Sequence, residues 1–172
     1  MNRILSAMPI LAPHATDPFQ DGRQSVNALM VRRGVMLMLM SQGFAIMPEM
    51  TLKTGRRADL AALSPKGDVW IIEIKSSLED LRSDTKWREY RDFCDQFYFA
   101  THAGVALSYF PSEAGFILSD AYGAEIVSPS PEHRLAAAGR KALTLRFARL
   151  AAARAMRAEL GLKQDDAFVD QP

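Results

Sequence analysis

The sequence is poor in cysteine and in net charge, and each shortage excludes a class of protein. Cys94 is the only cysteine among 172 residues, which excludes an internal disulfide and a cysteine-based zinc site. A chain without disulfides fits a reducing cytoplasm. Lysine and arginine total 21 against 20 acidic residues, a net charge of +1. Any nucleic-acid surface would therefore have to be a local basic patch.

The chain also lacks a segment that would predict membrane insertion or export. Its most hydrophobic run, Val35–Met40, has six residues, whereas a helix that spans a bilayer needs about 20. The short apolar run at the N-terminus is interrupted by Pro9, which does not fit a signal peptide. We therefore expect no membrane association.

The length predicts a single domain with two extensions. Four turn-forming residues, Pro9, Pro13, Pro18 and Gly22, mark residues 1–23 as a flexible N-terminal arm. Residues 24–160 would form the domain, and residues 161–172 an acidic C-terminal tail. The order of helix, three strands, second helix, further strands and long final helix indicates an α/β layer fold.

The expected elements can be placed along the chain from periodicity and from capping residues. Ser25 is a candidate N-cap for the first helix, and Ser83 for the second. Pro48 suggests an edge position or a bulge in the first strand. The other expected elements are a helix over Gln24–Gln42, strands over Phe44–Lys53, Asp95–Thr101, Val105–Phe110, Gly115–Leu118 and Ala124–Val127, and a helix from Glu132 to about Leu160, with a break near Gly139 as an alternative.

The remaining two strands form the hairpin that organises the chain. Strands over Arg56–Ala62 and Val69–Lys75 flank a turn at Ser64–Asp68, where Pro65 and Gly67 supply the turn chemistry. The second strand is apolar on both faces, which is typical of a central strand in a covered sheet. It nevertheless ends with a glutamate and a lysine.

Two acidic residues and a lysine meet at the end of this hairpin. Glu73 and Lys75 point to the same face, about 6–7 Å apart, and Asp59 can approach Glu73 across the turn. Two carboxylates in a partly buried place repel each other, and a hard divalent cation removes that repulsion. The plain structural alternative is a buried Glu–Lys ion pair beside a strand-end aspartate, although such burial rarely favours stability.

Asp59 followed by Glu73-x-Lys75 resembles the D…(D/E)-x-K signature of the PD-(D/E)XK nuclease superfamily, with Ala58 in place of its proline. The segments GRRADLAAL, VWIIEIKSSLEDLRSDTKW and YRDFCDQFYFA resemble the MmcB-related bacterial DNA repair family. The resemblance covers roughly Ser25–Ser128. It implies a restriction endonuclease-like αβββαβ core with a central mixed sheet flanked by helices, in a protein of the bacterial cytoplasm or nucleoid.

The resemblance also implies a Mg²⁺ site in which Mn²⁺ can substitute. Asp59, Glu73 and the backbone carbonyl of Ile74 would be its ligands, and Lys75 would orient the attacking water. In the superfamily the first helix often adds a glutamate to this site, but the first helix here has no acidic residue. Glu49 is then the candidate for that part, and an exposed strand glutamate is the alternative.

Basic residues beyond this cluster are candidates for DNA contacts. Arg56 and Arg57 precede Asp59 and could receive phosphate oxygens, and Lys86 lies on the helix after the hairpin. Solvent-facing charge is the alternative for each. The C-terminal helix could track a phosphate backbone, bind an acidic partner or be simply solvated. Its basic residues are Arg134, Arg140, Lys141, Arg146, Arg149, Arg154 and Arg157.

Three functions follow for this chain. The first is a Mg²⁺-dependent DNA endonuclease in repair, which hydrolyses phosphodiester bonds and, by the resemblance, leaves a 5′ phosphate. The second is a DNA-binding module of the same fold with weak or no cleavage. The third is an adaptor that binds other repair proteins through the basic helix. The DNA substrate and the oligomeric state stay open, and a homodimer would suit an enzyme that cuts both strands.

Overall fold

The computed structural model describes residues 25–162, so the predicted arm over 1–23 and residues 163–172 of the predicted tail lie outside the described residues. The domain limits stay a prediction. Within residues 25–162, no helix is both long and apolar enough to cross a bilayer. The elements are α1 (Val26–Ser41), β1 (Ala45–Thr51), β2 (Arg57–Leu63), β3 (Val69–Ile74), α2 (Leu78–Ser83), the 3₁₀ helix η1 (Trp87–Phe93), β4 (Gln96–Thr101), the 3₁₀ helix η2 (Leu107–Tyr109), β5 (Gly115–Ser119), β6 (Ala124–Ser128) and α3 (Ala137–Glu159).

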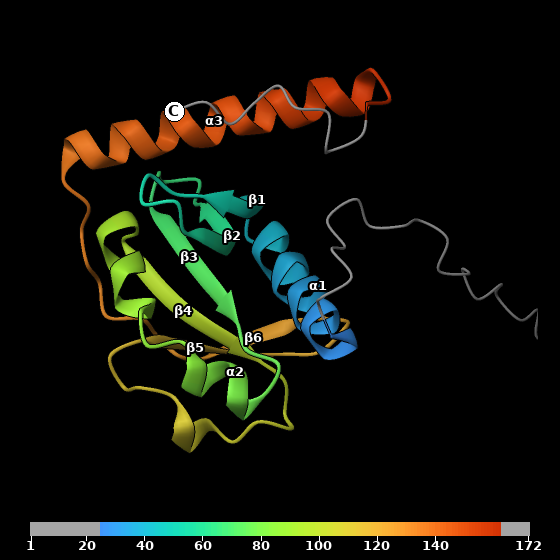
Figure 1. Cartoon of the computed structure of the whole chain (residues 1–172), viewed down its shortest axis with the longest axis vertical. Helices are drawn as coiled ribbons and strands as arrows, with labels where there is room; N and C mark the ends of the chain where they lie inside the picture. Colours follow the sequence, from blue (N-terminus) through green and yellow to red (C-terminus); the bar gives the residue numbers. More distant parts are fainter. Residues whose placement is uncertain (1–24, 163–172) are drawn as a thin grey trace, which may run out of the picture.

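The six strands form one mixed sheet in the order of the sequence, from β1 to β6. β1, β2 and β3 are antiparallel, β3, β4 and β5 are parallel, and β6 returns antiparallel to β5. A parallel pair needs a crossover connection, which α2 and η1 provide between β3 and β4 (Figure 1). The predicted α/β class and the αβββαβ order are confirmed.

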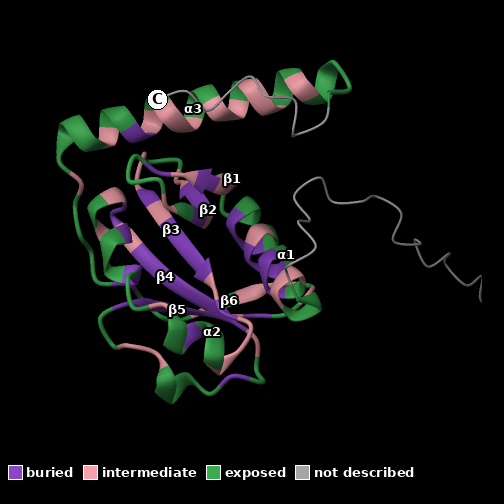
Figure 2. Ribbon diagram, viewed as in Figure 1, coloured by how far each residue is buried: buried purple, intermediate pink, exposed green. Residues whose placement is uncertain are grey.

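Helices cover both faces of the sheet, so that β3 is buried as its apolar sequence predicts. Val69, Ile71 and Ile72 are at most 4% exposed, and Figure 2 shows β3 and β4 as the buried centre of the molecule. On one face, α1 packs over Leu60, Ile72 and Ile117. On the other face, η1 and α3 cover a second cluster of buried side chains.

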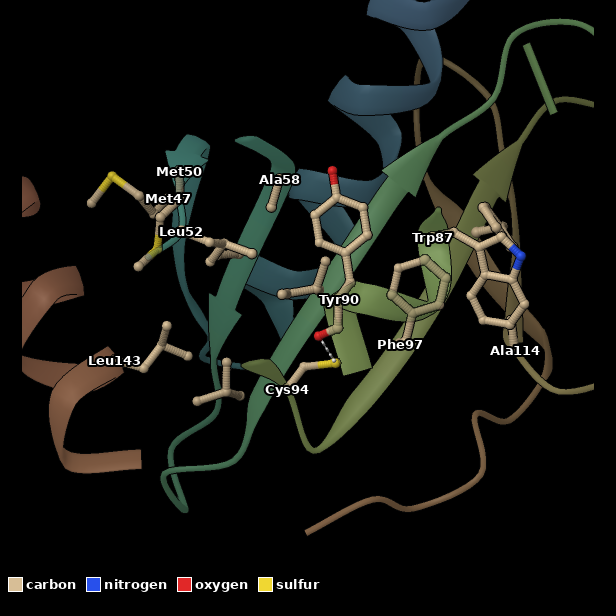
Figure 3. Close-up of a cluster of buried hydrophobic side chains, with 14 of the residues drawn as sticks. Met47, Met50, Leu52, Ala58, Trp87, Tyr90, Cys94, Phe97, Ala114 and Leu143 are labelled. Carbon is tan, nitrogen blue, oxygen red and sulfur yellow. Dashed lines mark hydrogen bonds between the residues drawn. The ribbon is translucent and has the colours of Figure 1, made fainter. Parts of the chain in front are cut away.

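The second cluster contains stacked aromatic rings from η1 and β4 (Figure 3). The ring of Phe97 lies 5.3 Å from that of Trp87 and 5.8 Å from that of Tyr90. Such aromatic pairs contribute about 0.5–1.5 kcal/mol each beyond area burial. Trp87, Tyr90 and Cys94 are all buried, which confirms that this segment supplies core packing.

α1 approaches the sheet closely because it carries a glycine where it meets the turn between β5 and β6. Ser25 caps the helix as predicted, accepting a hydrogen bond from the Ala28 amide at 3.1 Å. A Cβ on Gly34 would lie 2.0 Å from the carbonyl oxygen of Asp120. Since such a distance is a severe overlap, only glycine permits this contact.

Asp95 joins the start of β3 to the chain that leads into α3. Its carboxylate accepts hydrogen bonds from the amides of Val69 and Leu135, and two from the guanidinium of Arg140 at 2.6 and 2.8 Å. Burial by itself would raise the pKa of Asp95, but the bonds from Arg140 and the two amides lower it overall. The buried carboxylate of Asp95 thus fixes α3 to the sheet.

Three expected elements differ from the structure. The second helix is capped by Ser77, which accepts from the Asp80 amide, and Ser83 ends that helix instead of starting it. Residues 105–110 form a crossover containing η2 instead of a strand. α3 begins at Ala137, not Glu132, because the amides of His133 and Leu135 bind Asp95 in an extended connection; the helix then continues through Gly139 without a break.

Candidate functional site

The hairpin places Asp59 beside Glu73. Leu60 pairs with Ile72, so the next residues outward from the turn are these two acids. Here side chains replace the backbone ladder: the Asp59 amide donates to Glu73 Oε1 at 3.1 Å, and the Ile74 amide donates to Asp59 Oδ2 at 2.8 Å. Each carboxylate is therefore held by the opposite strand and keeps its second oxygen for another ligand.

Lys75 follows directly after β3 and is held by ion pairs. Its ammonium nitrogen lies 2.7 Å from Asp84 Oδ2 and 3.9 Å from Glu73 Oε2. Its backbone is fixed as well, because its amide donates to Ala100 O and its carbonyl accepts from Thr101. At 8% exposure, Lys75 presents one positive charge in a fixed position near the carboxylates.

These side chains line a cavity of about 270 Å³. It forms where the N-terminal half of α1, the edge strand β1, the end of the hairpin and α2 come together. The cavity is lined by Ser25, Ala28, Arg32, Glu49, Asp59, Glu73, Ile74, Lys75, Ser76, Asp80 and Ser83. The predicted metal ligands and the predicted lysine are thus brought into one concave place.

Burial gives both carboxylates of the hairpin an unusual affinity for protons. Desolvation, together with the nearby charge of Glu49, raises the pKa of Asp59 to about 6, although the Ile74 amide, Lys75 and Arg32 oppose the change. Desolvation, followed by repulsion from Asp59, raises the pKa of Glu73 well above its usual value. Two carboxylates that resist ionisation side by side are typical of a site that receives a cation.

Glu49 reaches the cavity through a distortion of β1. It falls between the pairs Pro48–Leu60 and Met50–Ala58, opposite Asp59, and its φ of 51° is left-handed. Such a conformation is uncommon for a residue other than glycine and costs about 1 kcal/mol or more. The exposed-glutamate alternative is wrong, because the Glu49 side chain is 11% exposed and its Oε2 lies 2.6 Å from Arg57 Nε.

The candidates for DNA contacts lie outside the cavity lining. Arg57 is bound to Glu49, and Arg56 lies 2.6 Å from Glu89 and above the ring of Tyr90. Lys86 is exposed at the start of η1. A role in binding DNA stays a prediction for all three.

One charged residue of the site, Arg32, was not predicted from the sequence. Arg32 is 3% exposed and lines the cavity from α1. The sequence pattern that could have identified it is a charge at helical spacing from the apolar Val35 and Leu39, on the face that the helix buries. Asp84, the partner of Lys75, is the C-cap residue of α2, whereas a helix that began at Ser83 would have placed it in the first turn.

Three arginines of α3 bind the protein's own backbone and Asp95. Arg146 donates to Thr51 O, and Arg154 donates to the carbonyls of Pro48 and Glu49. Arg140 binds Gly67 O in addition to Asp95. These three arginines therefore fix α3 to the sheet, whereas Lys141 and Arg149 are exposed on the outer side of the helix.

The donor set of the cavity suits a hard cation that keeps several waters. In the described part of the chain, no three His, Cys, Asp or Glu side chains are arranged as a ready ligand cluster. Mg²⁺ usually takes only one or two carboxylates from the protein. Asp59 and Glu73, with the Ile74 carbonyl nearby, fit that requirement, and Glu49 stands across from them.

Comparison with known proteins places the chain in a family. The family described as DNA repair protein MmcB-like matches residues 15–161. A solved structure of a protein of unknown function from Silicibacter pomeroyi is 35% identical, with a TM-score of 0.74 over 85% of this chain and 97% of that one. No curated protein matches. Because the family match spans most of the chain, this protein belongs to the MmcB-like family of DNA repair proteins.

Proposed function

We propose that this protein is a Mg²⁺-dependent DNA endonuclease of the PD-(D/E)XK type that acts in DNA repair. The observation that carries the proposal is the convergence of Asp59, Glu73 and Lys75 in one cavity, with desolvation raising the pKa of both acids. Membership in a DNA repair family supports DNA as the substrate. Mn²⁺ would substitute for Mg²⁺.

The chain's own residues account for most of the mechanism. Asp59 and Glu73, with the carbonyl of Ile74, would hold the cation, which supplies Lewis-acid polarisation of the scissile phosphate. Lys75, held by Asp84, would donate a hydrogen bond to the attacking water and offset the charge that develops on the phosphate oxygens. The bond to Asp84 keeps the ammonium in place before the substrate arrives, so little reorganisation is needed.

A second function is favoured by one observation. α1 brings an arginine to the cavity instead of a carboxylate, so the chain itself supplies a cation beside Asp59. In this alternative the fold binds DNA without cutting it. The charges of the cavity would then serve to hold a phosphate and not to activate water.

Cleavage assays separate the two functions. Labelled linear, single-stranded and branched DNA would be incubated with the protein and Mg²⁺, Mn²⁺ or EDTA. We expect cleavage that requires metal and is lost in Asp59→Asn and Glu73→Gln. Lys66→Ala, an exposed change in the turn of the same hairpin, should cut like wild type. DNA binding without cleavage by wild type would instead establish the binding module.

A further inference from the structure

Arg32 is a charged residue in a position that the fold otherwise gives to apolar side chains. Its neighbours on the buried side of α1 are Val31, Val35 and Leu39, each 0% exposed, and Arg32 itself is 3% exposed. Burying a guanidinium in this way is unfavourable unless negative charge lies close by. That charge is present, because the cavity that Arg32 lines also contains Glu49, Asp59 and Glu73.

The charges that line the cavity leave room for one divalent ion. Lys75 is already paired with Asp84 at 2.7 Å, and Glu49 with Arg57 at 2.6 Å. The remaining carboxylates of the lining, Asp59, Glu73 and the exposed Asp80, then carry two negative charges in total together with Arg32. One divalent cation would neutralise them, whereas a second would leave an excess of two positive charges beside a buried arginine.

We propose that Arg32 binds an oxygen of the DNA phosphate and takes the place of a second metal ion. The site then holds one divalent ion. This inference rests on the proposed function and names the phosphate-binding group within it. A guanidinium presents a planar fork of donors that matches phosphate oxygens.

The surroundings of Arg32 favour an anion on the same side. Ser25 and Ala28, at the N-terminal end of α1, line the cavity as well. The positive end of the helix dipole therefore adds to the charge of Arg32, and α1 has no acidic residue in its first turn to offset it. The cavity thus has an acidic wall on the hairpin and a positive wall on α1.

The test measures metal binding and DNA binding separately in Arg32→Met, which keeps the length of the side chain and removes its charge. Mn²⁺ binding to the full chain would be titrated by electron paramagnetic resonance. DNA affinity would be measured by fluorescence anisotropy with Ca²⁺, another cation that takes oxygen ligands. Arg33→Met is the matched control, because Arg33 is the next residue on the same helix and is exposed.

The expected changes have opposite signs. Loss of Arg32 should weaken DNA binding by roughly 10- to 100-fold, the value of a charge-assisted hydrogen bond. It should tighten Mn²⁺ binding by about tenfold, since a positive charge near the carboxylates is removed. A merely structural arginine would weaken both or neither, and that result would overturn the proposal. Arg33→Met should leave both affinities unchanged.

The number of bound ions gives an independent test. Wild type should bind one Mn²⁺, and Arg32→Glu, which replaces the positive charge by another carboxylate, should bind a second. If Arg32→Glu does not fold, the wild-type count still decides, because two ions in wild type would overturn the inference while leaving the nuclease proposal intact. Absence of any Mn²⁺ binding by wild type would instead contradict the proposed function itself.

Discussion

The cavity at the end of the hairpin and the helix α3 are both rich in charge, yet the charges act in different ways. In the cavity, carboxylates from separate strands are brought together, and desolvation raises the pKa of Asp59 and Glu73. On α3, Arg140, Arg146 and Arg154 bind Asp95 and backbone carbonyls of the sheet. α3 carries more charged side chains, but the carboxylates whose ionisation burial disfavours lie in the cavity.

The difference has a simple structural cause. β1 is an edge strand, and the outer side of such a strand presents carbonyl groups without a neighbouring strand. The arginines of α3 donate to the carbonyls of Pro48, Glu49 and Thr51 and so complete that edge. A run of arginines on a helix can therefore indicate an edge strand beneath it as well as a nucleic acid outside it.

Removing one positive charge from the cavity and one from α3 should give the largest difference between the two regions. Lys75→Met should lower the rate of DNA cleavage by about 10²–10³-fold, the usual loss when a fixed donor to the reacting phosphate is deleted. Arg149→Met, on the outer side of α3, should change the rate by less than about twofold. Both would be measured under single-turnover conditions. Equal losses in the two variants would show that α3 contacts the substrate.

A second substitution tests the structural role of α3. Arg140→Met leaves the buried carboxylate of Asp95 without its charged partner and should lower the free energy of unfolding by about 3 kcal/mol. Lys141→Met, the exposed neighbour, should change it by less than about 0.5 kcal/mol. Urea denaturation measures both. If Arg140→Met is as stable as wild type but binds DNA more weakly, α3 contacts the DNA and Arg140 does not stabilise the fold.

The charge of the cavity should be visible in the pH dependence of stability without metal. Burial raises the pKa of Asp59 to about 6, so the folded state holds its proton more tightly than the unfolded state. The resulting stability is present below about pH 4 and is lost as the pH rises through 6.

Asp59→Asn should therefore be more stable than wild type at pH 8 in EDTA, by about 1–2 kcal/mol, and equal to it near pH 4. The gain is limited because Asp59 is only half-buried. Adding Mg²⁺ should reverse the order at pH 8, since only wild type binds it. Thermal melts at both pH values measure this, and Asp92→Asn, an exposed change on η1, should show no such crossover.

The smallest effect is expected where the two regions meet. Arg154 donates to the carbonyl of Glu49, whose left-handed backbone brings its carboxylate to the cavity. Arg154→Met should lower the free energy of unfolding by about 1 kcal/mol and weaken Mn²⁺ binding several-fold. Arg149→Met again serves as the control. Unchanged Mn²⁺ affinity would show that α3 does not position Glu49.

Local patterns in the sequence were sufficient for the central elements. The turn residues between the two apolar strands predict the hairpin in which Asp59 meets Glu73, because the turn of a hairpin fixes its register. The capping serine and the apolar run of α1 likewise gave its limits to within two residues. These features depend on neighbours in the sequence.

Features that depend on distant parts of the chain could not be predicted. Ser77 and Ser83 are both suitable N-cap residues, and the structure uses Ser77. Leu107–Tyr109 has the composition of a strand, but β4 and β5 are parallel, so this segment must cross over between them. The position of Arg32 in the cavity could not be predicted without knowing that α1 lies beside the start of β2 and the end of β3.

Gly34 lets the helix that carries Arg32 lie against the turn between β5 and β6. A side chain there would meet the carbonyl of Asp120 at 2.0 Å, so α1 would have to move away from the sheet and carry Arg32 with it. The position of Arg32 thus depends on the absence of a side chain at a residue that does not line the cavity. A methyl group added at residue 34 would act as a spacer between α1 and the turn that follows β5.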